Sequence, residues 1–244
     1  MDVRRFWETA AIEPTEAGFV VLLDRRPMRL PGGAVLRIGP ERLALAIAAE
    51  WRAAGGGRGG SPSFEDTPLT RLAGTAQERI AGDPWPTVDA IARYGETDLL
   101  CYRVERPEEL VQRQARRWQP WLDWAAAKYD APLRVGTGVA PIRQHRGSIA
   151  SLRRAVAACD PYALAGLGLA VPALGSLVLG LVLASGRIDA AEAHALGALD
   201  ELFQAEKWGE DAEAAARRAS IAADIALAAR FMELAREEGR GPGG

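Results

Sequence analysis

The feature that most constrains the fold of this 244-residue chain is an uncharged run from Pro161 to Ser185. The run is rich in Leu, Val and Ala and is long enough to cross a bilayer as a helix, which takes about 20 residues. Pro172 and Gly175 interrupt it, and no basic cluster follows. Because internal helix breakers favour two short helices, we expect a buried helical hairpin, with a break near 170–175 and a second helix over 176–184. A membrane segment over 161–185 is the alternative.

The N-terminal part predicts a small β-sheet. Residues 18–23 (GFVVLL) are rich in β-branched and aromatic side chains, which favour strands. Further short strands are expected over 28–30 and 35–38. The residues at 24–27 and the Pro31-Gly32-Gly33 sequence supply the turns between them.

The pattern becomes helical from Pro40. Leu43, Ile47 and Trp51 recur at i, i+4 and i+8, which places them on one face of a helix. Further helices are predicted from Pro107 and over 147–158, 162–169, 176–184, 189–206 and 210–236. We therefore expect an α+β chain: a small β-rich N-terminal domain with one helix over 1–80, and a larger all-α domain over 81–244.

The composition excludes several classes of function. Thirty Lys and Arg against thirty-two Asp and Glu give a net charge of -2, which argues against a nucleic-acid binder. Two cysteines and two histidines are too few for a disulfide framework or a Cys- or His-rich metal site. The first residues, MDVRRFWETA, contain no apolar segment of signal-peptide length. We expect no metal, no cofactor and a cytoplasmic protein, or a chain already trimmed of a leader.

One glycine motif is present in the wrong context for nucleotide binding. Gly55, Gly57 and Gly60 match the G-x-G-x-x-G spacing. A dinucleotide site needs a strand before the glycines and a helix after them, whereas here a helix precedes them. We expect a glycine-rich loop. The chain also lacks the G-x-x-x-x-G-K-[ST] sequence of a P-loop.

The remaining chemically active side chains give weak signals. A hydrolase could use Ser176 with His145, but Ser176 lacks the flanking glycine pattern of a nucleophile elbow. His194 lies in a segment of helical composition. Cys101 follows Leu99-Leu100 in an apolar segment and is expected to be a small buried apolar residue. Cys159 has no basic neighbour of the kind that activates a thiolate. We expect no catalytic residue, and the hydrolase remains an alternative.

An acidic segment around a Trp-Gly pair is the most unusual part of the sequence. If one helix runs through it, Glu206, Glu210 and Glu213 share a face at i, i+4 and i+7. Alternatively, Gly209 ends one helix and the acids begin the next, where negative charge is favourable. The functional interpretation is an acidic docking site beside an aromatic anchor, Trp208, which suits a protein partner.

An ordered series of short motifs resembles a family of assembly chaperones for the catalytic head of ATP synthase, the "ATP twelve" family. Each motif is weak alone, and the series runs from Arg5 to the last helix. The matching pieces are Arg5-Phe6-Trp7, Leu23-Asp24, Arg26-Pro27, Leu43-Ala44, Ala49-Glu50-Trp51, Pro68-Leu69-Thr70-Arg71-Leu72, Tyr94, Thr97-Asp98, Cys101-Tyr102-Arg103, Gln114, Trp118, Trp124, Gly175-Ser176-Leu177-Val178, Asp200-Glu201, Gln204, Glu206, Trp208-Gly209, Asp211 and Glu213. The chain departs from the family pattern at Arg25, where glycine is frequent, in the glycine-rich loop 55–63, and at Gln77-Glu78.

The resemblance implies a non-catalytic chaperone that binds the free α subunit of ATP synthase until it pairs with the β subunit. It implies a β-rich N-terminal and a helical C-terminal domain, and a monomer located in the bacterial cytoplasm or in the mitochondrial matrix. The residues expected to contact the client are Glu206, Trp208, Gly209, Glu210, Asp211 and Glu213. An assembly factor anchored in the membrane through 161–185 is a further alternative.

Overall fold

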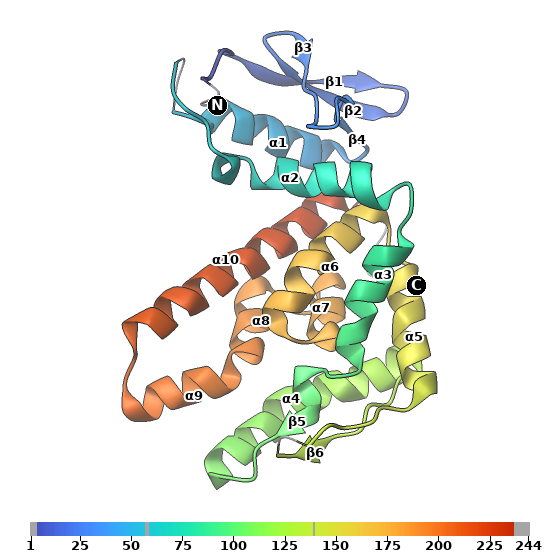
Figure 1. Ribbon diagram of the computed structural model, residues 1–244, viewed down its shortest axis with the longest axis vertical. Coiled ribbons are helices and arrows are strands. Elements are labelled where there is room, and N and C mark those ends of the chain that lie inside the picture. The colour runs from blue at the N-terminus through green and yellow to red at the C-terminus, as the bar shows by residue number, and fades with distance from the viewer. Residues whose placement is uncertain (1–3, 57–58, 139, 237–244) are drawn as a thin grey trace. The chain divides into compact units, whose positions relative to one another are not determined.

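The computed structural model describes residues 4–56, 59–138 and 140–236, which form two compact units (Figure 1). The described residues of the first unit are 4–56, 59–84, 161–165 and 230–236, and those of the second are 85–138, 140–160 and 166–229. A division at residue 80 remains our proposal for the domain boundary along the sequence. Two later segments, the start of one helix and the end of another, also belong to the first unit.

The first unit contains a small antiparallel sheet. Its strands are β1 (Ala10–Thr15), β2 (Gly18–Leu23), β3 (Arg26–Pro27) and β4 (Arg37–Ile38). β1 and β2 form a hairpin whose register runs from Ala10 opposite Leu23 to Thr15 opposite Gly18, and β2 also pairs with β3 and β4. The strand predicted over 18–23 is confirmed. The strand predicted over 28–30 is wrong, since that segment holds only a single bridge between Arg29 and Val35, and β4 is shorter than predicted.

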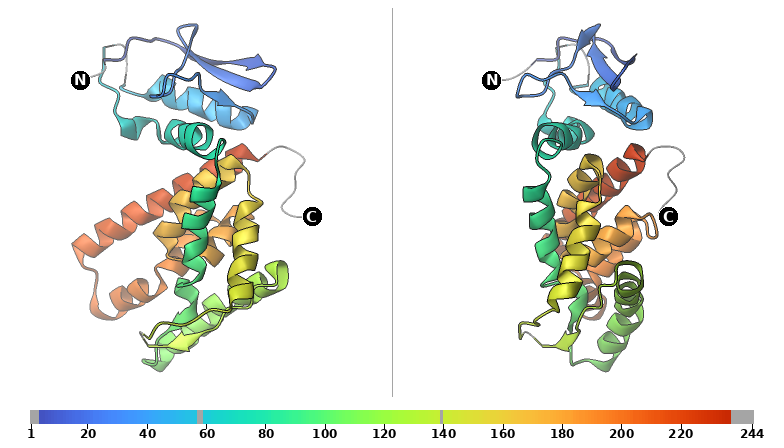
Figure 2. Two further views of the ribbon diagram at one scale, coloured as in Figure 1. Left: turned by 45° about the vertical axis from the view of Figure 1, so that its right-hand side comes forward. Right: turned by 90° about the vertical axis from the view of Figure 1, so that its right-hand side faces the viewer.

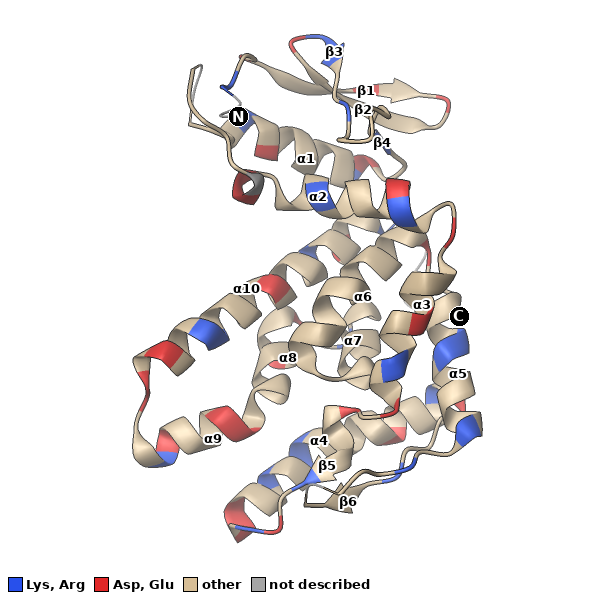
Figure 3. Ribbon diagram, viewed as in Figure 1, with Lys and Arg blue, Asp and Glu red and all other residues tan. Residues whose placement is uncertain are grey.

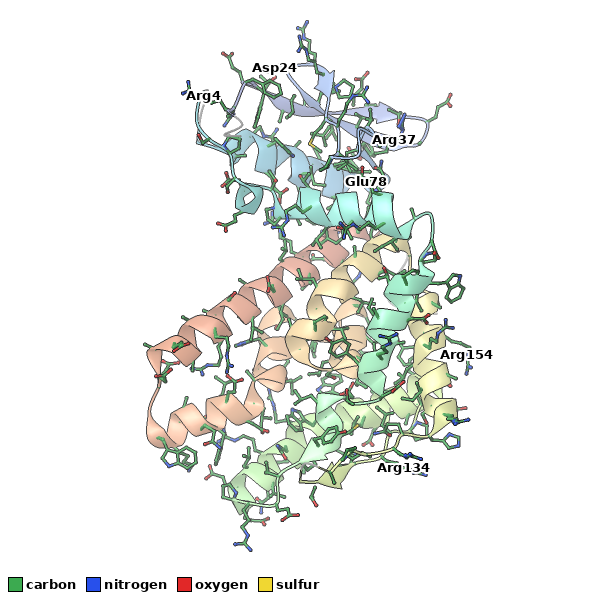
Figure 4. The ribbon with its side chains drawn as sticks, viewed as in Figure 1. Arg4, Asp24, Arg37, Glu78, Arg134 and Arg154 are labelled. Atoms are coloured by element: carbon green, nitrogen blue, oxygen red, sulfur yellow. The ribbon has the colours of Figure 1, made fainter. Side chains whose placement is uncertain are left out.

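The turn after β2 adopts a left-handed backbone without a glycine. Asp24 and Arg25 have φ angles of 46° and 68°, which cost a non-glycine residue about 1 kcal/mol each. The Asp24 carboxylate accepts hydrogen bonds from the Glu8 and Thr9 backbone N–H groups at 3.0 and 2.9 Å. Figure 4 labels Asp24 beside β3, at the edge of the sheet. These hydrogen bonds stabilise the turn formed by Asp24 and Arg25, where this chain has Arg25 and the family pattern frequently has glycine.

Two helices pack against each other next to the sheet. α1 (Glu41–Ala53) packs on β1 and β2 through its apolar face, which includes Leu43 and Ile47. The Glu50 carboxylate accepts hydrogen bonds from the Leu69 and Thr70 N–H groups in the first turn of α2 (Pro68–Thr75), at 2.7 and 3.1 Å. A negative charge there compensates for the unpaired N–H groups of the helix start. Burial nevertheless raises the pKa of Glu50.

The segment before α2 and the segment after it form short turns of helix. A 3₁₀ turn, η1 (Phe64–Asp66), precedes α2 and a π-helical turn, η2 (Ala76–Ile80), follows it. In η2, Gln77 donates to the Val35 carbonyl at 2.9 Å and accepts from the Arg37 N–H at 2.8 Å. This chain departs from the family pattern at Gln77-Glu78. The Gln77 side chain there joins η2 to the segment around β4 through these two hydrogen bonds.

The second unit is helical. Its elements are α3 (Trp85–Ala92), η3 (Arg93–Gly95), η4 (Leu99–Cys101), β5 (Tyr102–Arg103), α4 (Glu108–Tyr129), β6 (Gly136–Thr137), α5 (Arg146–Ala157), α6 (Pro161–Leu174), α7 (Leu177–Ala184), α8 (Ala190–Gly197), α9 (Leu199–Trp208) and α10 (Ala212–Ala235). α6 begins in the first unit and α10 ends there. β5 and β6 form a short parallel pair. Figure 2 shows α3 and α5 side by side in this unit, as their many contacts require.

Two predicted helix boundaries are wrong. The helix predicted over 162–169 extends to Leu174, so Pro172 lies inside α6. The helix predicted over 189–206 is two helices, separated at Ala198, which leaves the helical region with φ -97° and ψ 14°. The remaining helices begin and end within a few residues of the predicted bounds.

The uncharged run folds into the predicted helical hairpin. The chain turns at Gly175, whose φ of 62° suits glycine, and α7 begins two residues later. Every residue of α7 from Leu177 to Leu183 is buried, as expected for a helix that is apolar on all sides. Within residues 4–56, 59–138 and 140–236, no helix has both the length and the apolar character that crossing a membrane demands.

A buried carboxylate stabilises the break in this hairpin. Asp98 is completely buried and accepts from the Ser176 hydroxyl at 2.7 Å and from the Val178 and Leu100 N–H groups at 2.9 and 3.1 Å. The Ser176 hydroxyl in turn accepts from the Leu179 N–H at 3.0 Å. The two side chains thus cap the start of α7 and of η4 together. Burial raises the pKa of Asp98 to about 6 although these hydrogen bonds lower it.

Candidate protein-interaction site

The acidic segment forms a turn between two helices. α9 ends at Trp208, Gly209 follows with φ 90°, and α10 begins at Ala212. Asp211 caps α10, since its carboxylate accepts from the Ala214 N–H at 2.9 Å. We call residues 206–213 the acidic turn. The interpretation in which one continuous helix places Glu206, Glu210 and Glu213 on one face is therefore wrong. The alternative interpretation, in which Gly209 ends one helix and the acids begin the next, is confirmed. Figure 3 shows acidic positions on α9, on the connection and at the start of α10.

Trp208 projects into solvent at the end of α9. Its exposed fraction is 73%, the largest among the exposed large apolar side chains of the described residues. An open groove of about 540 Å³ lies beside it, lined by Arg106, Pro107, Glu109, Phe203, Lys207 and Trp208. An indole exposed to this extent gains free energy when a partner covers it, and tryptophan is enriched among residues that dominate interface energies.

Two side chains at the end of α9 form ion pairs with α4. Glu206 accepts from Arg113 through both carboxylate oxygens at 2.8 Å. Lys207 lies 2.7 Å from Glu109, one turn earlier on α4. The pKa of Glu109 is lowered by its hydrogen bond with Lys207. Arg113 and Lys207 also lie over the Phe203 ring, at 5.0 and 5.4 Å from its centroid.

Glu210 is paired with a buried cation. Arg218, on α10, has a side chain that is only 8% exposed, and it donates to Glu210 at 2.7 Å. Glu201, on α9, lies 3.8 Å from the same guanidinium and 3.0 Å from Arg217. The cluster holds the starts of α9 and α10 together, so Glu210 has a structural role in addition to its surface position.

Glu213 differs from the other acids of the turn. It is exposed in the first turn of α10, and within the described residues it has neither an ion pair nor a hydrogen bond from its side chain. Of the predicted contact residues, Glu213 and Trp208 are therefore the most available to a partner. Asp211 caps α10, as expected of an acid at a helix start, whereas the partners of Glu206 and Glu210, Arg113 and Arg218, were not predicted from the sequence.

A largely buried polar network ties α4 to α8 and to the start of α9. Gln114 donates to Asp200 at 2.8 Å and accepts from the Val104 N–H at 3.0 Å. The Trp118 indole N–H donates to the Leu196 carbonyl at 2.9 Å, and Arg103 lies 5.2 Å from the centroid of the Trp118 ring. Burial raises the pKa of Asp200 and lowers that of Arg103. These residues carry much of the family resemblance, and their role here is to position the helix that ends in Trp208.

Comparison with known proteins identifies the family. The model of the ATP12 chaperone protein family matches residues 4–126. The crystal structure of Atp12 from Paracoccus denitrificans is 46% identical, with a TM-score of 0.89, over 96% of this chain and 98% of that chain. The chain belongs to the ATP12 chaperone family. The fold, with its small N-terminal sheet and larger helical part, agrees with that relative.

Two further relatives of this ATP12 chaperone come from different sources. A solved structure from Agrobacterium tumefaciens is 36% identical, with a TM-score of 0.88, over 96% of this chain and 86% of that chain. The mitochondrial Atp12 protein of Schizosaccharomyces pombe is 25% identical over 224 residues, which are 86% of this chain and 75% of that protein. Family membership makes the chain an ATP synthase assembly chaperone, as the resemblance implied.

The residues of the alternative hydrolase occupy structural positions in this ATP12 chaperone. Ser176 is completely buried and donates to Asp98, whereas His145 caps α5 by accepting from the Gly147 N–H at 3.1 Å. In the part of the chain that the structure describes, the Nε2 of His194 is buried without a hydrogen-bond partner. The structure does not assemble Ser176, His145 and an acid into a triad.

The other sequence candidates also have structural surroundings. Burial raises the pKa of Cys101 to about 12 and that of Cys159 to about 11, so both remain thiols at neutral pH. Gly55 lies at the end of α1 with φ 69°, and Gly57 lies outside the described residues. No set of three His, Cys, Asp or Glu side chains within the described ranges is placed to hold a metal ion.

Proposed function

We propose that this ATP12 chaperone binds the free α subunit of ATP synthase and covers the surface that the β subunit later occupies. Family membership carries the proposal. A subunit of an obligate ring exposes a large apolar interface until its neighbour arrives, and such a surface invites aggregation. A chaperone that covers it must bind with moderate affinity, because the β subunit has to displace it.

The acidic turn is the proposed contact with the client. Trp208 supplies an exposed aromatic anchor with a groove beside it. Glu213, five residues later in the first turn of α10, supplies an exposed negative charge. Glu206, Gly209, Glu210 and Asp211 complete the surface. Charge at such a site contributes specificity and association rate without enlarging the apolar contact. This combination suits a client that must be recognised and then released.

The chaperone is proposed to act as a monomer that forms a one-to-one complex with its client. A relative of known structure is bacterial and another relative is mitochondrial. The proposed compartment is accordingly the cytoplasm for a bacterial chain and the matrix for a mitochondrial one. No cofactor and no catalytic step enter the proposal.

Light scattering tests the proposal. Purified α subunit is warmed alone and with an equimolar amount of the chaperone, and we expect the chaperone to suppress the rise in scattering. The variants Trp208→Ala and Glu213→Lys should lose most of this protection. Glu16→Lys, an equal charge reversal at an exposed position between β1 and β2, is the matched control and should retain it. Equal scattering with and without the wild-type chain would contradict the proposed function.

A further inference from the structure

Charge is strongly segregated along the chain. The segment from Ala131 to Cys159 contains five arginines, at 134, 143, 146, 153 and 154, and no Asp or Glu. The chain as a whole has a net charge of -2, so everything outside this segment is net acidic. Because these residues form α5 and the segment leading to it, the sequence places a basic patch on one part of an otherwise acidic unit.

All five arginine side chains are exposed. Figure 3 shows basic positions along α5 and along the segment before it, and Figure 4 labels Arg134 on that segment and Arg154 on α5. We call this surface the arginine face, and it consists of Arg134, Arg143, Arg146, Arg153 and Arg154. No part of the acidic turn contributes to it.

Most of the arginine face is not neutralised within the described chain. Arg153 donates to Asp89 of the neighbouring α3 at 2.6 Å. Arg154 donates to the Ser151 hydroxyl at 2.8 Å, and Arg134 lies 3.3 Å from the Arg143 carbonyl. These two partners are uncharged. Within residues 4–56, 59–138 and 140–236, only Arg153 of the five has a carboxylate partner.

Two exposed apolar side chains border these cations. Trp85, on α3, is 52% exposed and lies 5.0 Å below the Arg153 guanidinium, measured to the centroid of its ring, and Val135 is 43% exposed next to Arg134. Guanidinium groups bind carboxylates in a planar, two-bonded geometry, and apolar side chains beside them exclude water from such contacts. The surface therefore has the composition of a protein interface.

We propose that the arginine face binds an acidic segment of a protein partner. A short carboxylate-rich segment complements four cations that lack carboxylate partners. An extended polyanion such as a membrane surface or a nucleic acid would also meet the acidic remainder of the chain, where like charges repel it. The charge distribution thus favours a local acidic segment. This inference is separate from the acidic turn and does not depend on the α subunit being the client.

Fluorescence anisotropy tests this proposal with a labelled peptide of ten glutamates and a glutamine peptide of equal length. We expect the glutamate peptide to bind the wild-type chain more tightly than the glutamine peptide, with an affinity that falls as salt rises. The variant Arg143→Glu/Arg146→Glu should weaken binding about tenfold or more. Arg146 is the first residue of α5, where a glutamate is compatible with the helix dipole, so the fold should be retained.

The control is Arg26→Glu/Arg79→Glu, which reverses two exposed arginines of the first unit and should leave peptide affinity within about twofold of the wild type. Equal binding of both peptides, or unchanged binding by the Arg143→Glu/Arg146→Glu variant, would overturn the proposal. Binding to phosphatidylserine vesicles or to single-stranded DNA in preference to the glutamate peptide would also overturn it, because the partner would then be an extended polyanion.

Discussion

The acids of the acidic turn should separate into structural and exposed residues when each is reversed. Glu210→Lys removes the 2.7 Å partner of Arg218, whose side chain is 8% exposed, and places a second cation beside it. Removing one member of a fully buried pair costs about 3–5 kcal/mol. The cost here should be smaller, because Glu210 itself is 65% exposed and Glu201 stays 3.8 Å from the guanidinium. We expect a loss of about 2 kcal/mol in the free energy of unfolding.

Glu213→Lys is the matched variant, since it makes the same change three residues later with no intramolecular partner to lose. Its effect should stay within about 1 kcal/mol, because the reversal loses only the favourable interaction of an acid with the start of α10. For a chain of this length, about 2 kcal/mol corresponds to a fall in Tm of about 4–8 °C. Thermal unfolding followed by circular dichroism, with urea denaturation as a second probe, measures both variants.

Equal losses in the two variants would refute this reasoning, and so would an unchanged Tm for Glu210→Lys. Glu206→Lys should fall between them, because its partner Arg113 is 29% exposed and a partly exposed pair contributes about 1 kcal/mol or less. Client-binding experiments with the Glu210 variant therefore need a stability control, whereas those with the Glu213 variant do not.

Three further predictions concern the core. Gly180→Ala should destabilise the chain by about 1–3 kcal/mol in urea denaturation, because an added Cβ would lie 2.4 Å from a methyl group of Val171; an unchanged midpoint would show that α6 and α7 can separate freely. The pKa of Asp98 is raised to about 6 by burial, so the folded state binds its proton more tightly than the unfolded chain. As the pH rises from 4.5 to 7, the free energy of unfolding of the wild type should therefore fall by about 2 kcal/mol more than that of Asp98→Asn. The same change with pH in both proteins would contradict this. Burial raises the pKa values of Cys101 and Cys159, so iodoacetamide should modify both slowly in the native chain and rapidly in urea, as read by mass spectrometry; fast native labelling would contradict the burial.

Local sequence signals predicted the elements whose residues carry strong patterns. The strand over 18–23 is rich in β-branched and aromatic residues, and the uncharged run contains its own turn signal at Gly175. Strands were expected in the residues up to about 38, but β1 itself was not placed, because Ala10–Thr15 contains Glu13 and Pro14 and becomes a strand through its pairing with β2. The local sign that a helix ends near Ala198 is Gly197, and a single glycine inside a helical pattern is also tolerated within a continuous helix.

The candidate site shows a similar limit. Gly209 marked the break between α9 and α10, and the exposure of Trp208 agrees with an anchor at the end of a helix. The partners of Glu206 and Glu210 come from α4 and from the second turn of α10, at sequence distances that periodicity does not resolve. Arg218 is the clearest example, since a buried arginine in an Ala-rich helix has no local signature.

The most direct test of the central claim is size-exclusion chromatography with light scattering on the chain mixed with isolated ATP synthase α subunit and, separately, with β subunit. We expect a one-to-one complex with α, none with β, and loss of the complex with Trp208→Ala. Co-elution with β alone, or with neither subunit, would contradict it.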